Sequence, residues 1–196
     1  MKLPAAWQVR DVVLTTAALA CLYFLAYGLV WAVITPLQEG LLPEITRFAS
    51  LLFLPHGIRV LATALVGGKA VPGLVLGELA GNYLLWGIHD PVTLLLASLI
   101  AGTVTWAVFE GLFVLRINAF YLRVTDEPPP FHTLMLAGIL ASAANAFLLT
   151  SLLEPDLGAG SVMAILAAYM TGDITGLLAV LLGAHYIMPL VSRACE

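Results

Sequence analysis

The stretch Val12–Ile34 reads VVLTTAALACLYFLAYGLVWAVI and contains no charged residue. About 20 apolar residues are enough for a helix to cross the hydrocarbon core of a bilayer. Lys2 and Arg10 precede the stretch, as basic residues do in a signal peptide. The apolar run is too long for such a peptide, however, and no clear small-x-small cleavage site follows it. The stretch therefore predicts a membrane-spanning helix that stays in the mature protein.

Similar apolar runs recur along the whole chain. Hydrophobic residues make up 61% of the 196 positions, charged residues make up 10%, and the mean hydropathy is +1.01. The runs do not alternate with polar residues, which argues against the strands of a membrane barrel. The sequence predicts an all-α, polytopic transmembrane bundle of about six helices, forming a single domain over residues 1–196. The expected spans are residues 12–35, 45–67, 71–88, 92–115, 133–153 and 160–190.

The basic residues indicate the orientation of these spans, because cytoplasmic segments hold the excess of lysine and arginine. Segments on one side of the predicted topology hold Lys2, Arg10, Lys69, Arg116, Arg123 and Arg193. The other side holds only Arg47. We therefore expect both termini in the cytoplasm, together with a Pro-containing loop at residues 116–132.

Charge and motif content argue against several classes of protein. The net charge is -4 with only eight Lys and Arg residues, so no nucleic-acid partner is expected. Cys21 and Cys195 lack CxxC spacing, and no two histidines have the spacing of metal ligands, so no metal site is expected. The motifs GxSxG, HExxH and GK[ST] are absent, and the chain is expected not to be an enzyme. Whether the protein uses a cofactor is unknown from the sequence.

Span two contains the most specific feature, Leu54-Pro55-His56-Gly57-Ile58-Arg59. Proline removes a backbone donor and glycine lowers helix stability, so the helix should break near the bilayer midplane. A break exposes N–H groups and the positive end of a helix dipole, and Arg59 would add a fixed positive charge there. The alternative is a simple proline kink in which a carboxylate neutralises Arg59.

Span three contains a row of glycines at every fourth position, which forms a flat ridge for close helix contact. The ridge consists of Gly73, Gly77 and Gly81. It could pack within the bundle or against another chain. Glu78 and Asn82 share a face beside it. Because a short turn at residues 67–69 joins spans two and three, we expect these spans to be antiparallel neighbours, with an ion pair between Glu78 and Arg59.

Span six carries Asp173 between Gly172 and Gly176, in the middle of a long apolar helix. An ionisable side chain at bilayer depth costs at least about 2.5 kcal/mol, so it persists mainly where it is paired or functional. The glycines would let another backbone approach, and a lone buried aspartate would take up a proton or a cation. Taken together, the candidate ligand-binding residues are His56, Arg59, Glu78, Asn82 and Asp173.

Two regions resemble a known family, the bacterial membrane-associated sensor domains of the first described class. The first region carries Leu54–Arg59, Gly67-Gly68, Pro72-Gly73 and Leu76–Asn82, and the second carries Gly172-Asp173-Ile174-Thr175-Gly176. The sequence departs from the family's pattern at Leu54 and His56, and it ends without a kinase or cyclic-dinucleotide domain. The resemblance implies a short stand-alone relative in the bacterial inner membrane that either signals through a separate protein or uses the inherited site for something else.

We therefore expect a membrane-embedded ligand-binding or sensory module, surrounded by the lipid bilayer and acting through a membrane or cytoplasmic protein partner. An anionic or zwitterionic ligand would suit Arg59, and a cation would suit Glu78 and Asp173. One alternative is a solute-binding subunit of a membrane transporter, comparable with the substrate-capture components of energy-coupling vitamin transporters. Another is a structural assembly factor whose polar residues only join helices. Spans one, four and five are expected to serve mainly as walls.

Overall fold

The computed structural model describes residues 5–41, 50–121, 123, 128–153 and 159–194, and within these ranges it contains helices and no strand. The elements are α1 (Ala5–Leu29), the π-helical η1 (Val30–Ile34), α2 (Thr35–Leu41), α4 (Leu54–Val66), the 3-10 helix η2 (Gly67–Ala70), α5 (Val71–Leu84), α6 (Pro91–Val114), α7 (Phe131–Leu153) and α8 (Ala159–Ala194).

The prediction of an all-α polytopic membrane protein is confirmed. Among the described residues, five helical stretches are long and apolar enough to cross a membrane: Val9–Leu41, Leu54–Leu84, Pro91–Val114, Phe131–Leu152 and Val162–Tyr186. About six spans were expected. The difference lies in Leu54–Leu84, where α4 has 13 residues and α5 has 14. Each of these helices is shorter than the roughly 20 residues of a full crossing.

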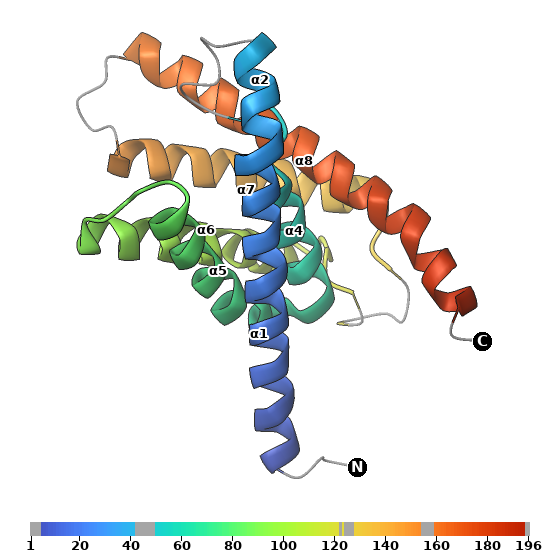
Figure 1. Cartoon of the computed structure of the whole chain (residues 1–196). Coiled ribbons are helices and arrows are strands. Elements are labelled where there is room, and N and C mark those ends of the chain that lie inside the picture. The colour runs from blue at the N-terminus through green and yellow to red at the C-terminus, as the bar shows by residue number, and fades with distance from the viewer. Residues whose placement is uncertain (1–4, 42–49, 122, 124–127, 154–158, 195–196) are drawn as a thin grey trace.

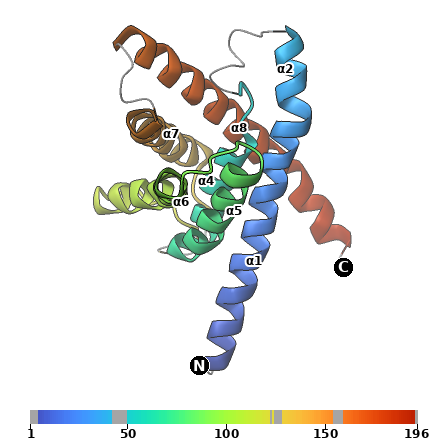
Figure 2. The same cartoon turned by 60° about the vertical axis from the view of Figure 1, so that its left-hand side comes forward.

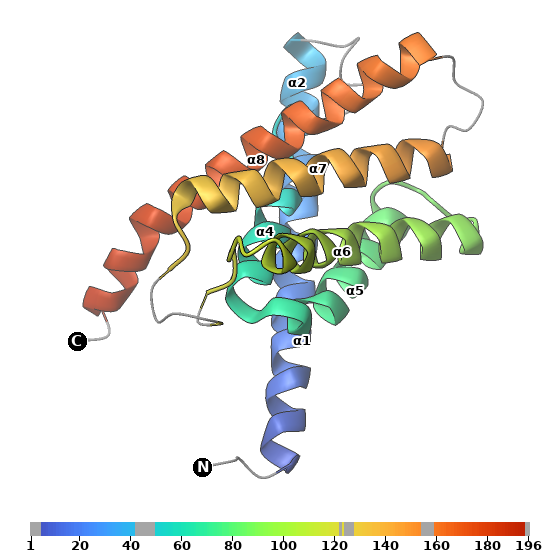
Figure 3. The same ribbon diagram turned by 180° about the vertical axis from the view of Figure 1, so that it is seen from behind.

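The long helices around α4 run in different directions: α1 crosses α6, α7 and α8, whereas α6 and α7 run alongside each other (Figure 1, Figure 3). In Figure 1, α1 stands upright, α6 and α7 run across it, and α8 lies diagonally. The view from behind in Figure 3 shows α7 between α8 and α6. Figure 2 shows α5 between α1 and α6. The central helix α4 packs against α1, α6, α7 and α8, so side chains on several of its faces are enclosed by protein.

The glycine ridge of α5 packs within the chain, against α1. A Cβ atom added at Gly73 would lie 2.8 Å from Leu19 Cβ, and one at Gly77 would lie 2.8 Å from the Tyr23 ring. At Gly81 the same atom would lie 2.9 Å from the Tyr27 ring. The absence of side chains on the ridge therefore permits this close approach, which settles the choice between packing within the bundle and packing against another chain.

The expectation that spans two and three are antiparallel neighbours is wrong. The main partner of α4 is α8, whereas α5 packs against α1 and α6. Glycine residues explain the packing partners of both helices. Gly57 lets α4 approach α8 closely, and the glycine ridge of α5 lets α1 approach α5. A Cβ atom at Gly57 would lie 2.6 Å from Val180 Cβ. The two short helices are joined by η2 and diverge to different partners.

The Pro-Gly element of span two starts a helix instead of kinking a continuous one. Residues 50–53 are not helical, and α4 begins at Leu54 with Pro55 in its first turn. Proline suits this position because the first N–H groups of a helix have no intrahelical partner. Span two was predicted to begin at residue 45, and residues 45–49 lie outside the described ranges.

The non-helical segment lies directly against α8. Phe53 N donates to Gly172 O at 2.9 Å, and the Thr175 hydroxyl donates to Leu51 O. A Cβ atom at Gly172 would lie 1.9 Å from Ser50 O, which no side chain could tolerate. The prediction that the glycines of span six let another backbone approach is confirmed. Non-helical backbone at membrane depth is tolerated where protein buries it, as α8 does here.

Candidate functional site

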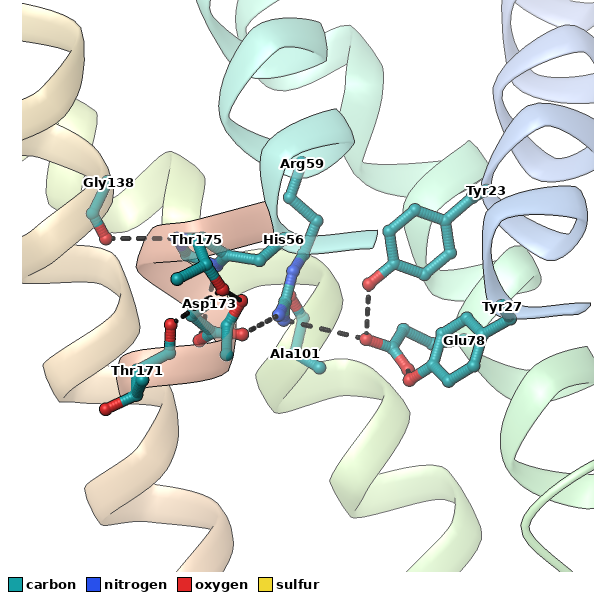
Figure 4. A network of polar contacts seen from close by, with 11 residues as sticks. Tyr23, Tyr27, His56, Arg59, Glu78, Ala101, Gly138, Thr171, Asp173 and Thr175 are labelled. Carbon is teal, nitrogen blue, oxygen red and sulfur yellow. Dashed lines mark hydrogen bonds and ion pairs between the residues drawn. The ribbon is translucent and has the colours of Figure 1, made fainter. Parts of the chain in front are cut away.

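Arg59, on α4, lies at the centre of a buried network of ionisable side chains (Figure 4). Its Nη1 atom lies 3.6 Å from Glu78 Oε1 on α5, and its Nη2 atom lies 4.0 Å from Asp173 Oδ1 on α8. Nη1 also donates a 3.1 Å hydrogen bond to the carbonyl of Ala101 on α6. The predicted pair of Arg59 and Glu78 is confirmed, although both ionic distances exceed the 2.7–2.9 Å typical of a tight charged hydrogen bond.

Two tyrosines of α1 hold the carboxylate of Glu78. Tyr23 OH donates to Glu78 Oε1 at 2.6 Å, and Tyr27 OH donates to Oε2. The two rings are packed edge to face with centroids 5.4 Å apart. Both carboxylate oxygens therefore accept a hydrogen bond from α1, which fastens α5 to α1 at this level.

The tyrosines are functional candidates that the sequence analysis missed, since span one was interpreted as a wall. A signal was present in their spacing. Residues four apart lie on the same helix face, and a buried tyrosine hydroxyl normally finds a polar partner. In the structure Tyr23 and Tyr27 are 0% and 4% exposed, and both hydroxyls find this partner in Glu78.

His56 connects the other end of the network to α7 and α8. Its Nδ1 atom lies 3.5 Å from Asp173 Oδ2, and its Nε2 atom lies 3.0 Å from the carbonyl of Gly138 on α7. His56 is 0% exposed and Asp173 is 4% exposed. The start of α4 thus supplies two side chains, His56 and Arg59, that face the same carboxylate.

Asn82 is the predicted site residue with a different set of contacts. Its Nδ2 atom donates a 3.2 Å hydrogen bond to Ser98 Oγ, which joins α5 to α6 one turn beyond Glu78. The structure brings together the other predicted residues, His56, Arg59, Glu78 and Asp173. Asn82 is therefore a helix-joining residue beside the network.

The network suits a small charged ligand better than a large organic one. Its ionisable side chains are at most 4% exposed. An apolar hollow of about 90 Å³ between α1 and α4 is lined by Leu19, Leu22, Ile58, Leu61, Ala62 and Leu65. None of the network residues lines this hollow. Within the described ranges, no group of three or more His, Cys, Asp or Glu residues could hold a metal ion.

A second ion pair lies outside the network, at the end of α6. Glu110 Oε1 accepts hydrogen bonds from Trp106 Nε1 at 3.0 Å and from Arg123 Nη1 at 2.8 Å. The Arg123 guanidinium also lies over the rings of Phe113 and Phe120, at 4.1 and 4.5 Å from their centroids. The side chains of Glu110 and Arg123 are 32% and 39% exposed, so this pair fastens a surface segment onto α6.

The fold and the network define a polytopic helical membrane protein with an enclosed ionic network that joins α1, α4, α5, α6, α7 and α8. Comparison of the chain with protein-family models, with curated proteins and with solved structures finds no match.

Proposed function

We propose that the chain is a membrane-embedded ligand-binding or sensory module that acts through a separate protein partner. The observation that carries this proposal is the position of Arg59, which is shared between Glu78 and Asp173 at 3.6 and 4.0 Å. These carboxylates belong to different helices. A guanidinium that contacts both of them loosely can move toward either one when the charge of the other changes.

The helix contacts give such a movement a mechanical consequence. Glu78 is fastened to α1 through Tyr23 and Tyr27, while Asp173 lies on α8, the main partner of α4. A ligand that neutralises Asp173 would strengthen the attraction between Arg59 and Glu78 and would shift α4 relative to α8. Ligand binding can shift such an equilibrium only through its different affinity for the two arrangements. Here the charge of Asp173 provides that difference.

Location and orientation are part of the same proposal. In Figure 1, α1 begins at the bottom and α8 ends at the lower right, whereas α2 ends at the top and α6 and α8 begin at the left. This grouping is compatible with both termini on one side of the membrane. The basic residues would make that side the cytoplasm, and the resemblance to the sensor domains would place the chain in a bacterial inner membrane. A protein partner would then sense the change through the cytoplasmic ends of the helices.

A solute-binding transport subunit is the second candidate. The observation that favours it is the non-helical segment at residues 50–53, which lies against α8 at the level of Gly172. Broken helices near the midplane form the substrate sites of several transporter folds. A structural assembly factor is the third candidate, and it predicts a network that does not respond to any ligand.

Distance measurements between spin labels test the proposal. In a background in which serine replaces Cys21 and Cys195, one labelled pair at Leu65→Cys and Leu182→Cys reports on α4 and α8. Both positions are about half exposed, at 48% and 51%. A matched pair on α1 and α5 uses Leu22→Cys and Leu76→Cys, which are 50% and 51% exposed. Protein in lipid nanodiscs is measured with protons, sodium, potassium, phosphate, glutamate and lysine as probes.

We expect at least one probe to change the distance between α4 and α8 while the distance between α1 and α5 stays constant. In the Arg59→Gln variant the response should disappear, because the shared cation is absent. If no probe changes the distance between α4 and α8 in the wild-type protein, the sensory proposal is contradicted and the assembly factor is favoured. Binding of a probe that leaves both distances unchanged would instead favour the solute-binding subunit of a transporter.

A further inference from the structure

The hydrogen bond to Gly138 determines which nitrogen of His56 carries a hydrogen. Nε2 lies 3.0 Å from the Gly138 carbonyl, and a carbonyl oxygen can only accept. Nε2 is therefore a donor. In a neutral imidazole the other nitrogen, Nδ1, then carries a lone pair. Asp173 Oδ2 lies 3.5 Å from this nitrogen.

Without an additional proton, two acceptors face each other at this contact. An ionised carboxylate only accepts hydrogen bonds, and so does the Nδ1 atom of this tautomer. Nδ1 is buried and has no hydrogen-bond partner in the part of the chain that the structure describes. A buried polar atom without a partner is destabilising by about 1–3 kcal/mol. One proton placed on Nδ1 or on Asp173 Oδ2 turns the contact into a donor–acceptor pair.

The net charge of the network also indicates one additional proton. Arg59 contributes one positive charge, whereas Glu78 and Asp173 contribute two negative charges. Tyr23 and Tyr27 are neutral, and both donate to Glu78, so among the described contacts of the network it is the one between His56 Nδ1 and Asp173 that lacks a hydrogen. The described contacts from α6 and α7 are the uncharged carbonyls of Ala101 and Gly138. A proton between His56 and Asp173 brings the buried network to neutrality, which a low-dielectric interior strongly favours.

We propose that His56 and Asp173 form an intramembrane proton-binding site, and that a proton is the ligand of this module. The inference rests on the proposed function, since it names the ligand of the same network. The proton comes from water and returns to water, and only an N–H or O–H bond forms or breaks. Its release leaves the network with one uncompensated negative charge and draws Arg59 toward Asp173, and its binding lets Arg59 approach Glu78.

Nitrogen spectroscopy tests this assignment directly. The other three histidines, His89, His132 and His185, are exposed and can be replaced by glutamine, which leaves His56 as the only imidazole. The sample is this variant in nanodiscs, with its histidine ring labelled with ¹⁵N, between about pH 4 and about pH 9, a range that brackets the ordinary pKa of histidine. Infrared difference spectra report the protonation of Asp173, with Asp173→Asn used to assign its band.

Near neutral pH we expect either Nδ1 of His56 or the carboxyl group of Asp173 to carry a proton. As the pH rises, the pair should release this single proton. In Asp173→Asn the midpoint of the His56 titration should fall by at least about one pH unit, because a nearby carboxylate raises the affinity of imidazole for a proton by that order. The matched control is Glu110→Gln, which removes a carboxylate from the exposed pair with Arg123 and should leave the midpoint unchanged.

A free Nδ1 lone pair beside an ionised Asp173 near neutral pH would overturn the proposal. So would a midpoint that depends on sodium concentration, because the site would then bind a metal cation in place of the proton. The spin-label experiment distinguishes a failure of the proton assignment from a failure of the proposed sensory function. Proton binding without movement of α8 contradicts the sensory function alone, whereas movement driven by another probe without proton binding contradicts the proton assignment alone.

Discussion

Arg59 and Glu78 belong to helices that make little contact with each other, yet Arg59 Nη1 lies 3.6 Å from Glu78 Oε1. The helix α4 packs mainly against α8, and α5 packs against α1 and α6. The ion pair therefore connects two separately packed parts of the fold. Removal of either charge should affect both the stability of the protein and the coupling between its helices.

A double-mutant cycle on this pair should show strong coupling. Glu78→Gln leaves Arg59 with only the more distant Asp173, and loss of one partner of a buried pair typically costs about 3–5 kcal/mol. We expect a loss of at least about 2 kcal/mol, with the double variant Arg59→Met/Glu78→Gln destabilised by less than the sum of its single variants. Reversible unfolding in mixed micelles measures these free energies.

The matched control for this cycle is the surface pair of Glu110 and Arg123. Their side chains are 32% and 39% exposed, and exposed pairs contribute about 0–1 kcal/mol. Glu110→Gln should therefore lower the free energy of unfolding by less than about 1 kcal/mol. Equal effects of Glu78→Gln and Glu110→Gln would mean that burial does not strengthen the central pair.

Loss of a tyrosine hydroxyl should destabilise the contact between α1 and α5. Tyr23→Phe removes the 2.6 Å donor to Glu78 and leaves the ring in place. Hydrogen bonds to charged groups contribute about 1.5–3 kcal/mol, so a loss in that range is expected. Tyr83→Phe is the control, because Tyr83 is 50% exposed and its ring contacts the ring of His89. Thermal unfolding in the same detergent compares the two variants.

A methyl group at Gly176 should be tolerated far less well than one elsewhere on α8. Its Cβ atom would lie 2.1 Å from Phe53 O, a backbone atom that cannot rotate away. Gly176→Ala should therefore separate residues 50–53 from α8 and reduce the yield of folded protein. At Gly183 nothing lies within 4 Å, and Gly183→Ala should be neutral or more stable by up to about 1 kcal/mol. Similar yields of both variants in size-exclusion profiles would contradict the close contact.

Cysteine labelling in intact cells tests the orientation. In the background without Cys21 and Cys195, a membrane-impermeant maleimide should label Asp90→Cys in intact cells. It should label Lys69→Cys only after permeabilisation, because basic residues favour the cytoplasmic side. Both positions are exposed in the structure, so access to the reagent depends on the membrane and not on burial. The opposite labelling pattern would show that both termini lie outside the cytoplasm.

Much of the network was predictable because charges inside apolar spans are rare and must be compensated. Arg59, Glu78 and Asp173 each interrupt an apolar run, and this interruption alone marks them as residues that need a partner. Tyr23 and Tyr27 were missed because tyrosine is common in membrane proteins, and their four-residue spacing marks a shared helix face without saying which side chain lies opposite. Asn82 lies four residues after Glu78, and this spacing suggested a shared site. In the structure its side chain instead donates a hydrogen bond to Ser98 on α6.

The sequence by itself determined the class of this protein, because long uncharged stretches such as Val12–Ile34 can satisfy their backbone hydrogen bonds in a membrane only as helices. It also determined which residues needed partners there. Only the tertiary structure decided the pairing, since partner choice depends on which backbones approach most closely. Glycines of α5 admit α1, and glycines of α8 admit the start of α4, so Arg59 lies between two carboxylates that are far apart along the chain.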